Sequence, residues 1–136
     1  MDANGGCYCG AVRYHVTGEF KGKLLCFCRE CQVVSGGAGT VAGIVPAAGF
    51  HYTKGEPGRF TRPDLPHPVT REFCTNCGTP LTTRVPWSAA IAILKIGTLD
   101  DPSLFGQADM VYYTSEKQVY HTCPEGVPAF EKFPPR

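Results

Sequence analysis

The sequence predicts a mainly β fold, and three observations support that prediction. Apolar and polar residues alternate over short runs, which is the period of a half-buried strand. Sixteen glycines and 12 prolines are spread along the 136 residues, so turns recur throughout the chain. No segment offers three helical turns of apolar periodicity. Short strands bounded by glycine and proline are typical of an all-β sandwich or barrel.

Four strands are expected in the first half of the chain. Residues 11–16 alternate apolar and polar side chains, and residues 40–45 are rich in β-branched side chains. Residues 50–53 form a short run before the glycine- and proline-rich turn 54–58, and residues 59–62 follow that turn.

The second half of the chain is expected to add four more strands. Residues 69–73 alternate up to Cys74, and residues 81–85 leave that cysteine. Residues 91–96 indicate a strand with one buried face, and residues 110–113 complete the set.

Helical segments are expected to be short. Residues 29–35 are long enough for one or two turns after Cys28. Asp101 suits the N-cap of a single turn that has Pro102 at its first helical position. Helical turns should therefore only connect the strands.

Length and composition narrow the possible functions. The length predicts one domain, residues 1–136. A net charge of +1 without a lysine or arginine run argues against a nucleic-acid partner. No apolar stretch approaches the ~20 residues that span a bilayer, so no membrane partner is expected.

The first six residues lack the features of a signal peptide, which predicts a cytoplasmic location. Clustered cysteines in that reducing compartment indicate metal binding or catalysis.

Seven of the eight cysteines lie in three short clusters. The clusters are Cys7/Cys9, Cys26/Cys28/Cys31 and Cys74/Cys77. Thiolates this close in sequence can point at one zinc ion, whereas a disulfide between near neighbours is strained. The chain is therefore expected to bind metal.

The spacing of the cysteines favours two zinc ions per chain. Cys74 and Cys77 with the following glycine form a zinc knuckle, and Cys7 and Cys9 form a tighter version. Paired, these four thiolates would close a structural site. The remaining Cys26/Cys28/Cys31 cluster offers three ligands with an open fourth position, the pattern of catalytic zinc. Three thiolates leave the zinc site with a net charge of about −1, which makes the zinc a weak Lewis acid but a suitable site for an incoming thiolate.

Two other interpretations of the cysteines stay open. Cys28 and Cys31 with Cys74 and Cys77 have the spacing of a zinc ribbon, which needs one zinc. Alternatively, Cys28 and Cys31 act as a redox dithiol without metal. Counting the zinc ions per chain separates these possibilities.

A few further residues are candidates for the site. His121 is expected to face the open cluster as a proton-transfer group. Trp87 and Phe27 are candidate walls of a small pocket, and the loop 35–39 is expected to bring backbone amides to it. Cys123 is expected to be a small buried residue rather than a ligand.

Four segments in order resemble the glutathione-dependent formaldehyde-activating enzyme family, which also includes centromere protein V. These segments are residues 6–14, 26–36, 73–81 and 97–102. The resemblance implies an Mss4-like, tent-shaped antiparallel β-sheet fold with zinc knuckles and only short helical turns. It places the structural zinc on Cys7, Cys9, Cys74 and Cys77. It places the catalytic zinc on Cys26, Cys28 and Cys31.

The resemblance also implies an activity. The family is named for the addition of glutathione to formaldehyde, which gives S-hydroxymethylglutathione and is classed as carbon–sulfur lyase activity. The expected partners are a small thiol such as glutathione and a small aldehyde. Zinc would raise the thiolate fraction, and His121 or water would protonate the product oxygen. The alternative is a non-catalytic, zinc-stabilised binding module.

The chain departs from the family pattern beside the open cluster. Phe27 stands where relatives often carry histidine, and Gln32 and Val33 stand where they often carry a basic pair. Basic groups there would favour an anionic tripeptide such as glutathione. These positions therefore bear on which thiol the chain uses.

Overall fold

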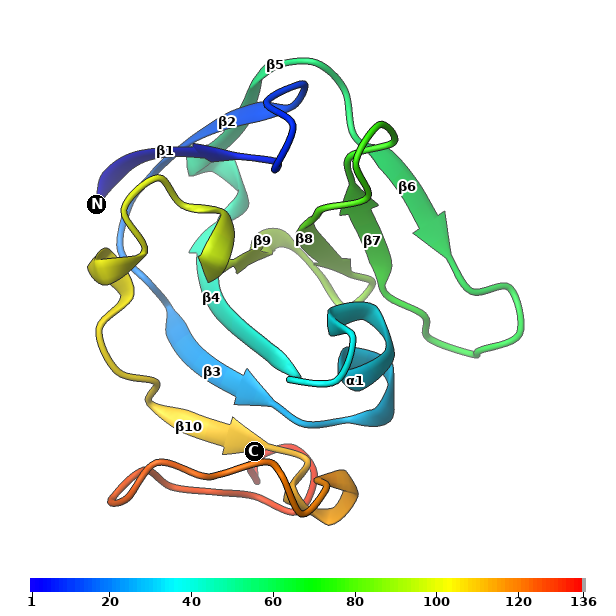
Figure 1. Cartoon of the computed structure of the whole chain (residues 1–136), viewed down its shortest axis with the longest axis vertical. Coiled ribbons are helices and arrows are strands. Elements are labelled where there is room, and N and C mark those ends of the chain that lie inside the picture. The colour runs from blue at the N-terminus through cyan, green and yellow to red at the C-terminus, as the bar shows by residue number, and fades with distance from the viewer. Residues whose placement is uncertain (136) are drawn as a thin grey trace.

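Ten β-strands dominate the computed structural model, which describes residues 1–135 (Figure 1). The strands are β1 (Asp2–Gly6), β2 (Arg13–Thr17), β3 (Gly22–Cys26), β4 (Thr40–Pro46), β5 (Phe50–Lys54), β6 (Gly58–Thr61), β7 (Thr70–Phe73), β8 (Pro80–Val85), β9 (Ser88–Lys95) and β10 (Met110–Tyr112). The helical elements are α1 (Arg29–Ser35) and the 3₁₀ turns η1 (Ala47–Gly49), η2 (Ile96–Thr98), η3 (Pro102–Phe105) and η4 (Thr114–Glu116). The predicted mainly β fold is confirmed.

The strands form two sheets. The smaller sheet has the order β1-β2-β5, and the larger has the order β10-β3-β4-β9-β8-β7-β6. Neighbouring strands are antiparallel except β10 and β3, which are parallel. Both the sheets and the short helical turns agree with the Mss4-like arrangement.

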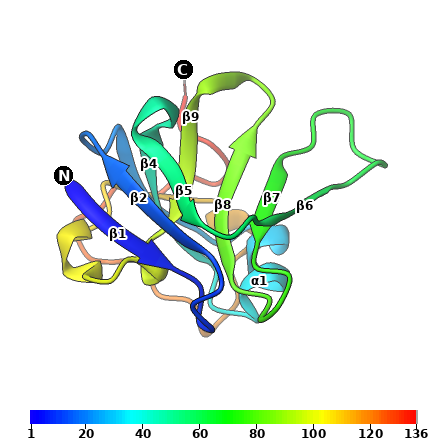
Figure 2. The ribbon, with the colours of Figure 1, turned by 90° about the horizontal axis from the view of Figure 1, so that it is seen from above.

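The main hydrophobic core lies between the two sheets (Figure 2). Tyr14 and Phe50 contribute from the small sheet, and their rings lie 5.0 Å apart. Val45 and Leu94 contribute from the large sheet and are fully buried. One face of the large sheet is therefore covered by the small sheet.

The opposite face of the large sheet carries a different set of side chains. Thr83 pairs with Arg71 on one side and with Ile93 on the other, and Lys95 follows Ile93 by two residues. Because side chains alternate between faces along a strand, these four share the face away from the main core. The helix α1 and the segment after β10 lie at the edges of this face (Figure 1).

All the strands expected from the sequence are present, and their ends shift by no more than a few residues. Residues 29–35 form the α-helix, as expected. Asp101 caps η3 by accepting a hydrogen bond from the Ser103 N–H at 3.1 Å, with Pro102 in the first turn. Among residues 1–135, no helix has the length and apolarity needed to cross a bilayer.

Two strands were not expected, β1 and β3. In β1 the run Asp-Ala-Asn-Gly-Gly has poor strand propensity, and it is a strand because it pairs with β2 along its whole length. In β3 the adjacent leucines pack on opposite faces of the sheet, with Leu24 buried and Leu25 partly buried. A strand covered on both faces does not alternate, so its sequence lacks the period of two.

Candidate metal centres and the adjoining pocket

Four cysteine sulfurs converge where the two sheets meet. The Sγ atoms of Cys7, Cys9, Cys74 and Cys77 all lie within 4.8 Å of one another. Cys9 Sγ lies 3.6 Å from Cys7 Sγ and 3.8 Å from Cys74 Sγ. A tetrahedron of about 2.3 Å zinc–sulfur bonds has edges of about 3.8 Å. The donor set therefore fits a zinc ion in both chemistry and size.

Hydrogen-bonding groups of the surrounding loops contact three of these sulfurs. The Val12 N–H donates to Cys7 Sγ at 3.2 Å, and Asn76 Nδ2 donates to Cys9 Sγ at 3.2 Å. The Thr79 hydroxyl lies 3.1 Å from Cys77 Sγ and lowers the pKa of that thiol to about 5. Donors of this kind are what a thiolate metal site needs.

Left-handed glycines turn the chain around both halves of the four-sulfur cluster. Gly10 follows Cys9 and Gly78 follows Cys77, and both have φ of 80°. An L-residue rarely adopts this conformation, whereas glycine does so without strain. Each cysteine pair can therefore fold back on itself and present two sulfurs in one direction.

The three remaining clustered cysteines form a second group at the start of α1. Cys26 ends β3, Cys28 caps α1, and Cys31 lies in its first turn. Their sulfurs lie within 4.8 Å of one another, and Cys28 Sγ accepts from the Cys31 N–H at 3.4 Å. Hydrogen bonds from Cys26 and Cys28 lower the pKa of the Cys31 thiol. In residues 1–135 this group contains no fourth Cys, His, Asp or Glu.

The grouping of the sulfurs decides between the two-site arrangement and the zinc ribbon. Cys28 and Cys31 gather with Cys26, whereas Cys74 and Cys77 gather with Cys7 and Cys9. The zinc ribbon, which needs Cys28, Cys31, Cys74 and Cys77 together, is therefore not formed. The two-group arrangement expected from spacing is the one observed.

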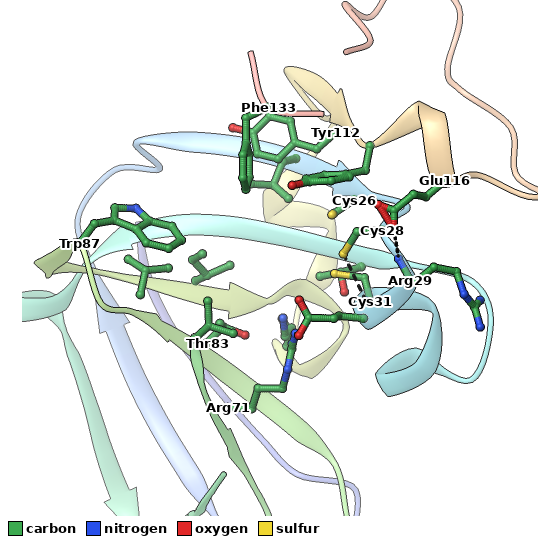
Figure 3. A pocket seen from close by; sticks show the side chains of 18 residues that line it. Cys26, Cys28, Arg29, Cys31, Arg71, Thr83, Trp87, Tyr112, Glu116 and Phe133 are labelled. Atoms are coloured by element: carbon green, nitrogen blue, oxygen red, sulfur yellow. Dashed lines mark hydrogen bonds and ion pairs between the residues drawn. The ribbon is translucent and has the colours of Figure 1, made fainter. Parts of the chain in front are cut away.

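A pocket of about 300 Å³ opens directly beside the three-cysteine group (Figure 3). It is lined by Leu24, Cys26, Cys28, Arg29, Glu30, Cys31, Thr40, Val69, Arg71, Thr83, Val85, Trp87, Ile93, Lys95, Tyr112, Tyr113, Glu116 and Phe133. In Figure 3 the sulfurs lie on one side of the pocket and Trp87 on the other, with Tyr112 and Phe133 along one edge. This volume is at the small end of the range for small-molecule sites.

The pocket contains both positive and negative groups near the sulfurs. Arg71 Nη2 lies 3.8 Å from Glu30 Oε1. Burial lowers the pKa of Lys95 to about 8, although the neighbouring Cys31 thiolate acts in the opposite direction. Sequence reasoning did not single out Lys95. The sequence does contain a signal for it: Lys95 interrupts the apolar run 91–96, and two residues after Ile93 it lies on the same face of the strand.

Thr83 also lines the pocket and was not singled out from the sequence. Its side chain is buried, with a relative exposure of 5%. Its Oγ1 has no hydrogen-bond partner within residues 1–135. Nothing in the local sequence distinguishes it from Thr82, which faces the other side of the sheet.

His121 does not face the three-cysteine group, contrary to expectation. Its ring stacks on Phe27 with centroids 4.5 Å apart, and both residues line a different hollow. Its Nδ1 accepts from the Gln118 N–H at 2.9 Å, and its Nε2 lies 2.6 Å from the Gly37 oxygen. Phe27 points away because neighbouring residues of an extended chain alternate in direction. We therefore assign no proton transfer to His121.

The glycine loop after α1 is also engaged elsewhere. The Gly37 and Gly39 N–H groups donate to Ser35 Oγ at 3.3 and 2.9 Å, and not to the pocket. Of the two expected pocket walls, Trp87 lines the pocket and Phe27 does not. Cys123 is half-buried and belongs to neither sulfur group.

Gln32 is buried and fastens the three-cysteine loop to the chain after β10. Its Nε2 donates to the Phe27 oxygen at 2.7 Å and to the Glu116 oxygen at 2.8 Å. A lysine or arginine at this buried position has no oxygen to accept the hydrogen bond that Gln118 Nε2 donates to Gln32 Oε1, and burying its charge costs desolvation energy. In this chain the glutamine at position 32 therefore holds the loop in place, which explains why no basic residue stands there.

Two comparisons with known proteins are informative. A family model described as glutathione-dependent formaldehyde-activating enzyme matches residues 2–116. The fold is similar to a crystal structure of a Rhodobacter sphaeroides protein, with a TM-score of 0.61 and 18% sequence identity. That match covers 77% of this chain and 96% of the other. At this identity, the similarity shows the fold alone.

Proposed function

Because this chain belongs to the family of glutathione-dependent formaldehyde-activating enzymes, we propose that it is a zinc-dependent carbon–sulfur lyase. Its substrate would be the adduct of a thiol and an aldehyde, as in the synthesis of S-(hydroxymethyl)glutathione from glutathione and formaldehyde. In the forward direction the thiol sulfur bonds to the carbonyl carbon, and the thiol proton ends on the carbonyl oxygen. The reverse direction breaks the same carbon–sulfur bond.

The observation that carries this proposal is the three-cysteine group opening on a pocket. Four ligands close a structural zinc, whereas three leave a position for substrate. The other group, with four sulfurs, has no such position and would hold a structural zinc. We therefore assign Cys26, Cys28 and Cys31 to the catalytic centre and Cys7, Cys9, Cys74 and Cys77 to the structural one.

The side chains of the pocket define how a thiol and an aldehyde would meet. Zinc at the three-cysteine group would act as a Lewis acid and lower the pKa of an incoming thiol. Lys95 and Arg71 place positive charge beside the sulfurs, which favours thiolate over thiol. The walls hold the aldehyde next to that thiolate, so the reaction gains from proximity.

Replacing Cys28 by serine tests the assignment. Cys28→Ser is expected to abolish turnover of glutathione plus formaldehyde while the fold and one of two zinc ions remain. Cys123→Ser is the matched control, because Cys123 lies in neither sulfur group. It should keep both zinc ions and full activity.

The measurements are zinc per chain, circular dichroism and the rate of adduct formation. Loss of both zinc ions from Cys28→Ser, or activity that survives in it, would contradict the site assignment. A wild-type protein that holds two zinc ions but turns over no thiol would support the non-catalytic binding module instead.

A further inference from the structure

Thr83 leaves a buried hydroxyl unpaired at the pocket wall. Its Oγ1 has no partner within residues 1–135, and the residue is only 5% exposed. A buried hydroxyl without a partner destabilises the folded protein. Thr83 shares its sheet face with Arg71 and Ile93, so its side chain lies on the pocket side of the sheet. A ligand oxygen in the pocket would satisfy it.

Exposed aromatic side chains border the pocket away from the sulfurs. Trp87 and Phe133 are each 57% exposed, although both are large and apolar. The Phe133 ring meets Tyr112 edge-on at 5.6 Å and Tyr113 edge-on at 5.1 Å. Figure 3 shows Trp87 and the Phe133–Tyr112 pair on different sides of the same opening. Such a border suits an apolar ligand body.

The chain after β10 holds Phe133 in place. The Val111 N–H donates to the Pro128 oxygen and the Phe130 N–H to the Val111 oxygen, both at 2.9 Å. The Tyr113 N–H donates to the Lys132 oxygen at 3.1 Å. This segment lies beyond residue 116, where the family match ends. Trp87 and Tyr112 lie within the matched residues, so only the contribution of Phe133 to the aromatic border goes beyond the family match.

The basic groups of the pocket already have partners at its cysteine end. Arg71 pairs with Glu30, and Arg29 Nη1 donates to Gln32 Oε1. The positive charge of Lys95 lies beside the cysteine sulfurs. Toward Trp87 the lining is Val69, Val85 and Ile93. Charged groups moved from water to such a wall lose hydration without gaining partners. A tripeptide thiol is therefore poorly matched to this part of the pocket.

We propose that the pocket selects a thiol with an apolar, aromatic body, and that Thr83 binds the oxygen of the aldehyde half. This inference rests on the proposed lyase function. The body of the thiol lies between Trp87, Tyr112 and Phe133, and its sulfur lies at the three-cysteine group. As the carbon–sulfur bond forms, the carbonyl oxygen becomes a hydroxyl, and Thr83 Oγ1 hydrogen-bonds it in both states. No oxidant or reductant is required.

Binding can be measured without turnover, because Trp87 is the only tryptophan of the chain. Zinc-loaded protein is titrated with 2-phenylethanethiol and with glutathione while tryptophan fluorescence is followed. We expect the Kd of 2-phenylethanethiol to be lower than that of glutathione by about tenfold or more. Tighter binding of glutathione would overturn the apolar assignment.

Phe133→Ala tests the aromatic wall. It should weaken 2-phenylethanethiol binding by about tenfold and glutathione binding much less. Phe60→Ala is the matched control, because Phe60 is 55% exposed and does not line this pocket. Equal effects of Phe133→Ala on the two thiols would contradict the proposal.

Thr83→Val tests the oxygen site. The variant removes the unpaired hydroxyl and keeps the shape, so it should unfold at the same or a higher temperature. We expect kcat/KM for formaldehyde with 2-phenylethanethiol to fall about tenfold. Thr82→Val is the control, because the Thr82 hydroxyl donates to Glu72 on the opposite face. It should be less stable with unchanged kcat/KM.

The outcomes separate the inference from the function on which it rests. If Thr83→Val keeps the wild-type kcat/KM, the oxygen site is wrong although the lyase function stands. If neither thiol reacts with formaldehyde in the wild type, the lyase function fails. In that case the two fluorescence titrations still decide whether the pocket prefers an apolar thiol.

Discussion

Gly5 is the residue of β1 that brings this strand close enough to cover the core. A methyl group on Gly5 would lie 2.3 Å from Tyr14 Oη and 2.4 Å from the Thr98 oxygen. The Tyr14 hydroxyl in turn hydrogen-bonds Thr98 Oγ1 at 2.8 Å. The side chain of Tyr14 is fully buried and has no space to move away. Glycine at this position is therefore a packing requirement.

Gly5→Ala is expected to destabilise the protein by about 1–3 kcal/mol, because overpacking displaces Tyr14 or the backbone. Gly97→Ala is the control, since a methyl group there meets nothing within 4 Å. Urea unfolding of both variants measures the effect. A Gly5→Ala variant as stable as Gly97→Ala would contradict this account of β1.

Individual site residues differed in how far the sequence could predict them. Cysteine spacing favoured both sulfur groups, because two or three residues fix how neighbouring thiols can meet. It did not fix which clusters pair, and the zinc ribbon stayed open until the sulfurs were placed in space. His121 was misplaced because adjacency to Cys123 in sequence says nothing about which side of Phe27 it occupies. Thr83 and Lys95 went unnoticed because their meaning depends on the strands beside them.

Glu72 of β7 joins four strands through one buried carboxylate. Its oxygens accept from Arg59 Nε of β6 at 2.8 Å, from Arg84 Nε of β8 at 3.1 Å and from Tyr52 Oη of β5 at 3.0 Å. Burial alone would raise the pKa of Glu72, but the hydrogen bond from Thr82 and the charge of Arg84 outweigh it and lower the pKa. The carboxylate form therefore stabilises the packing of β5 on the large sheet.

Glu72→Gln is expected to cost about 2 kcal/mol at pH 7, because the charged hydrogen bonds are lost. The folded pKa lies below the unfolded value of 4.5, so the wild type gains stability above about pH 4.5. That gain disappears as the pH falls through the folded pKa. The stability difference between wild type and variant should therefore shrink in acid.

Urea unfolding of wild type and Glu72→Gln at several pH values between roughly 3 and 7, the range in which carboxylates titrate, measures this stability difference. Glu56→Gln, at an exposed position, is the control and should follow the wild type at every pH. A Glu72→Gln deficit that is independent of pH would show that the carboxylate charge is not responsible.

The sequence predicts a strand where one of its faces is buried and the other meets water, because its side chains then alternate between apolar and polar. It does not predict a strand whose two faces have similar surroundings. The run before Cys74 alternates because Glu72 and its neighbours lie on opposite faces of the sheet. β3 carries adjacent leucines because both its faces are covered. β1 is polar and rich in glycine, and the close approaches of Gly5 to Tyr14 and of Gly6 to Val12 explain its two glycines.

The four-sulfur group connects segments that are far apart in the sequence. Cys9 and Cys74 are 65 residues apart, yet their sulfurs lie 3.8 Å from each other. One pair follows β1 of the small sheet, and the other connects β7 and β8 of the large sheet. A zinc ion here would therefore hold the two sheets together. The folded state alone presents this site, so zinc binding would contribute directly to folding stability.

Cys7→Ser is expected to lose one zinc ion and to unfold at a temperature at least about 10 °C lower, since structural zinc contributes strongly to folding. Cys28→Ser should also lose one zinc ion but keep its unfolding temperature within a few degrees, roughly as for a surface change. Should Cys7→Ser fail to fold, a chelator added to Cys28→Ser removes the one remaining zinc ion, and the drop in its unfolding temperature gives the same comparison. Equal unfolding temperatures for the two variants would contradict the division into structural and catalytic centres.

The sequence alone determined the mainly β class, most of the strands and the cysteines that could hold metal ions. Those features depend on short-range patterns: side-chain alternation, turn residues and the spacing of thiols. The pairing of Cys7/Cys9 with Cys74/Cys77 and the pocket beside Cys26, Cys28 and Cys31 emerged with the folded chain. So did the unpaired hydroxyl of Thr83 and the wall formed by Phe133. These features join strands that are distant in sequence, and sheet register decides which of their side chains share a face.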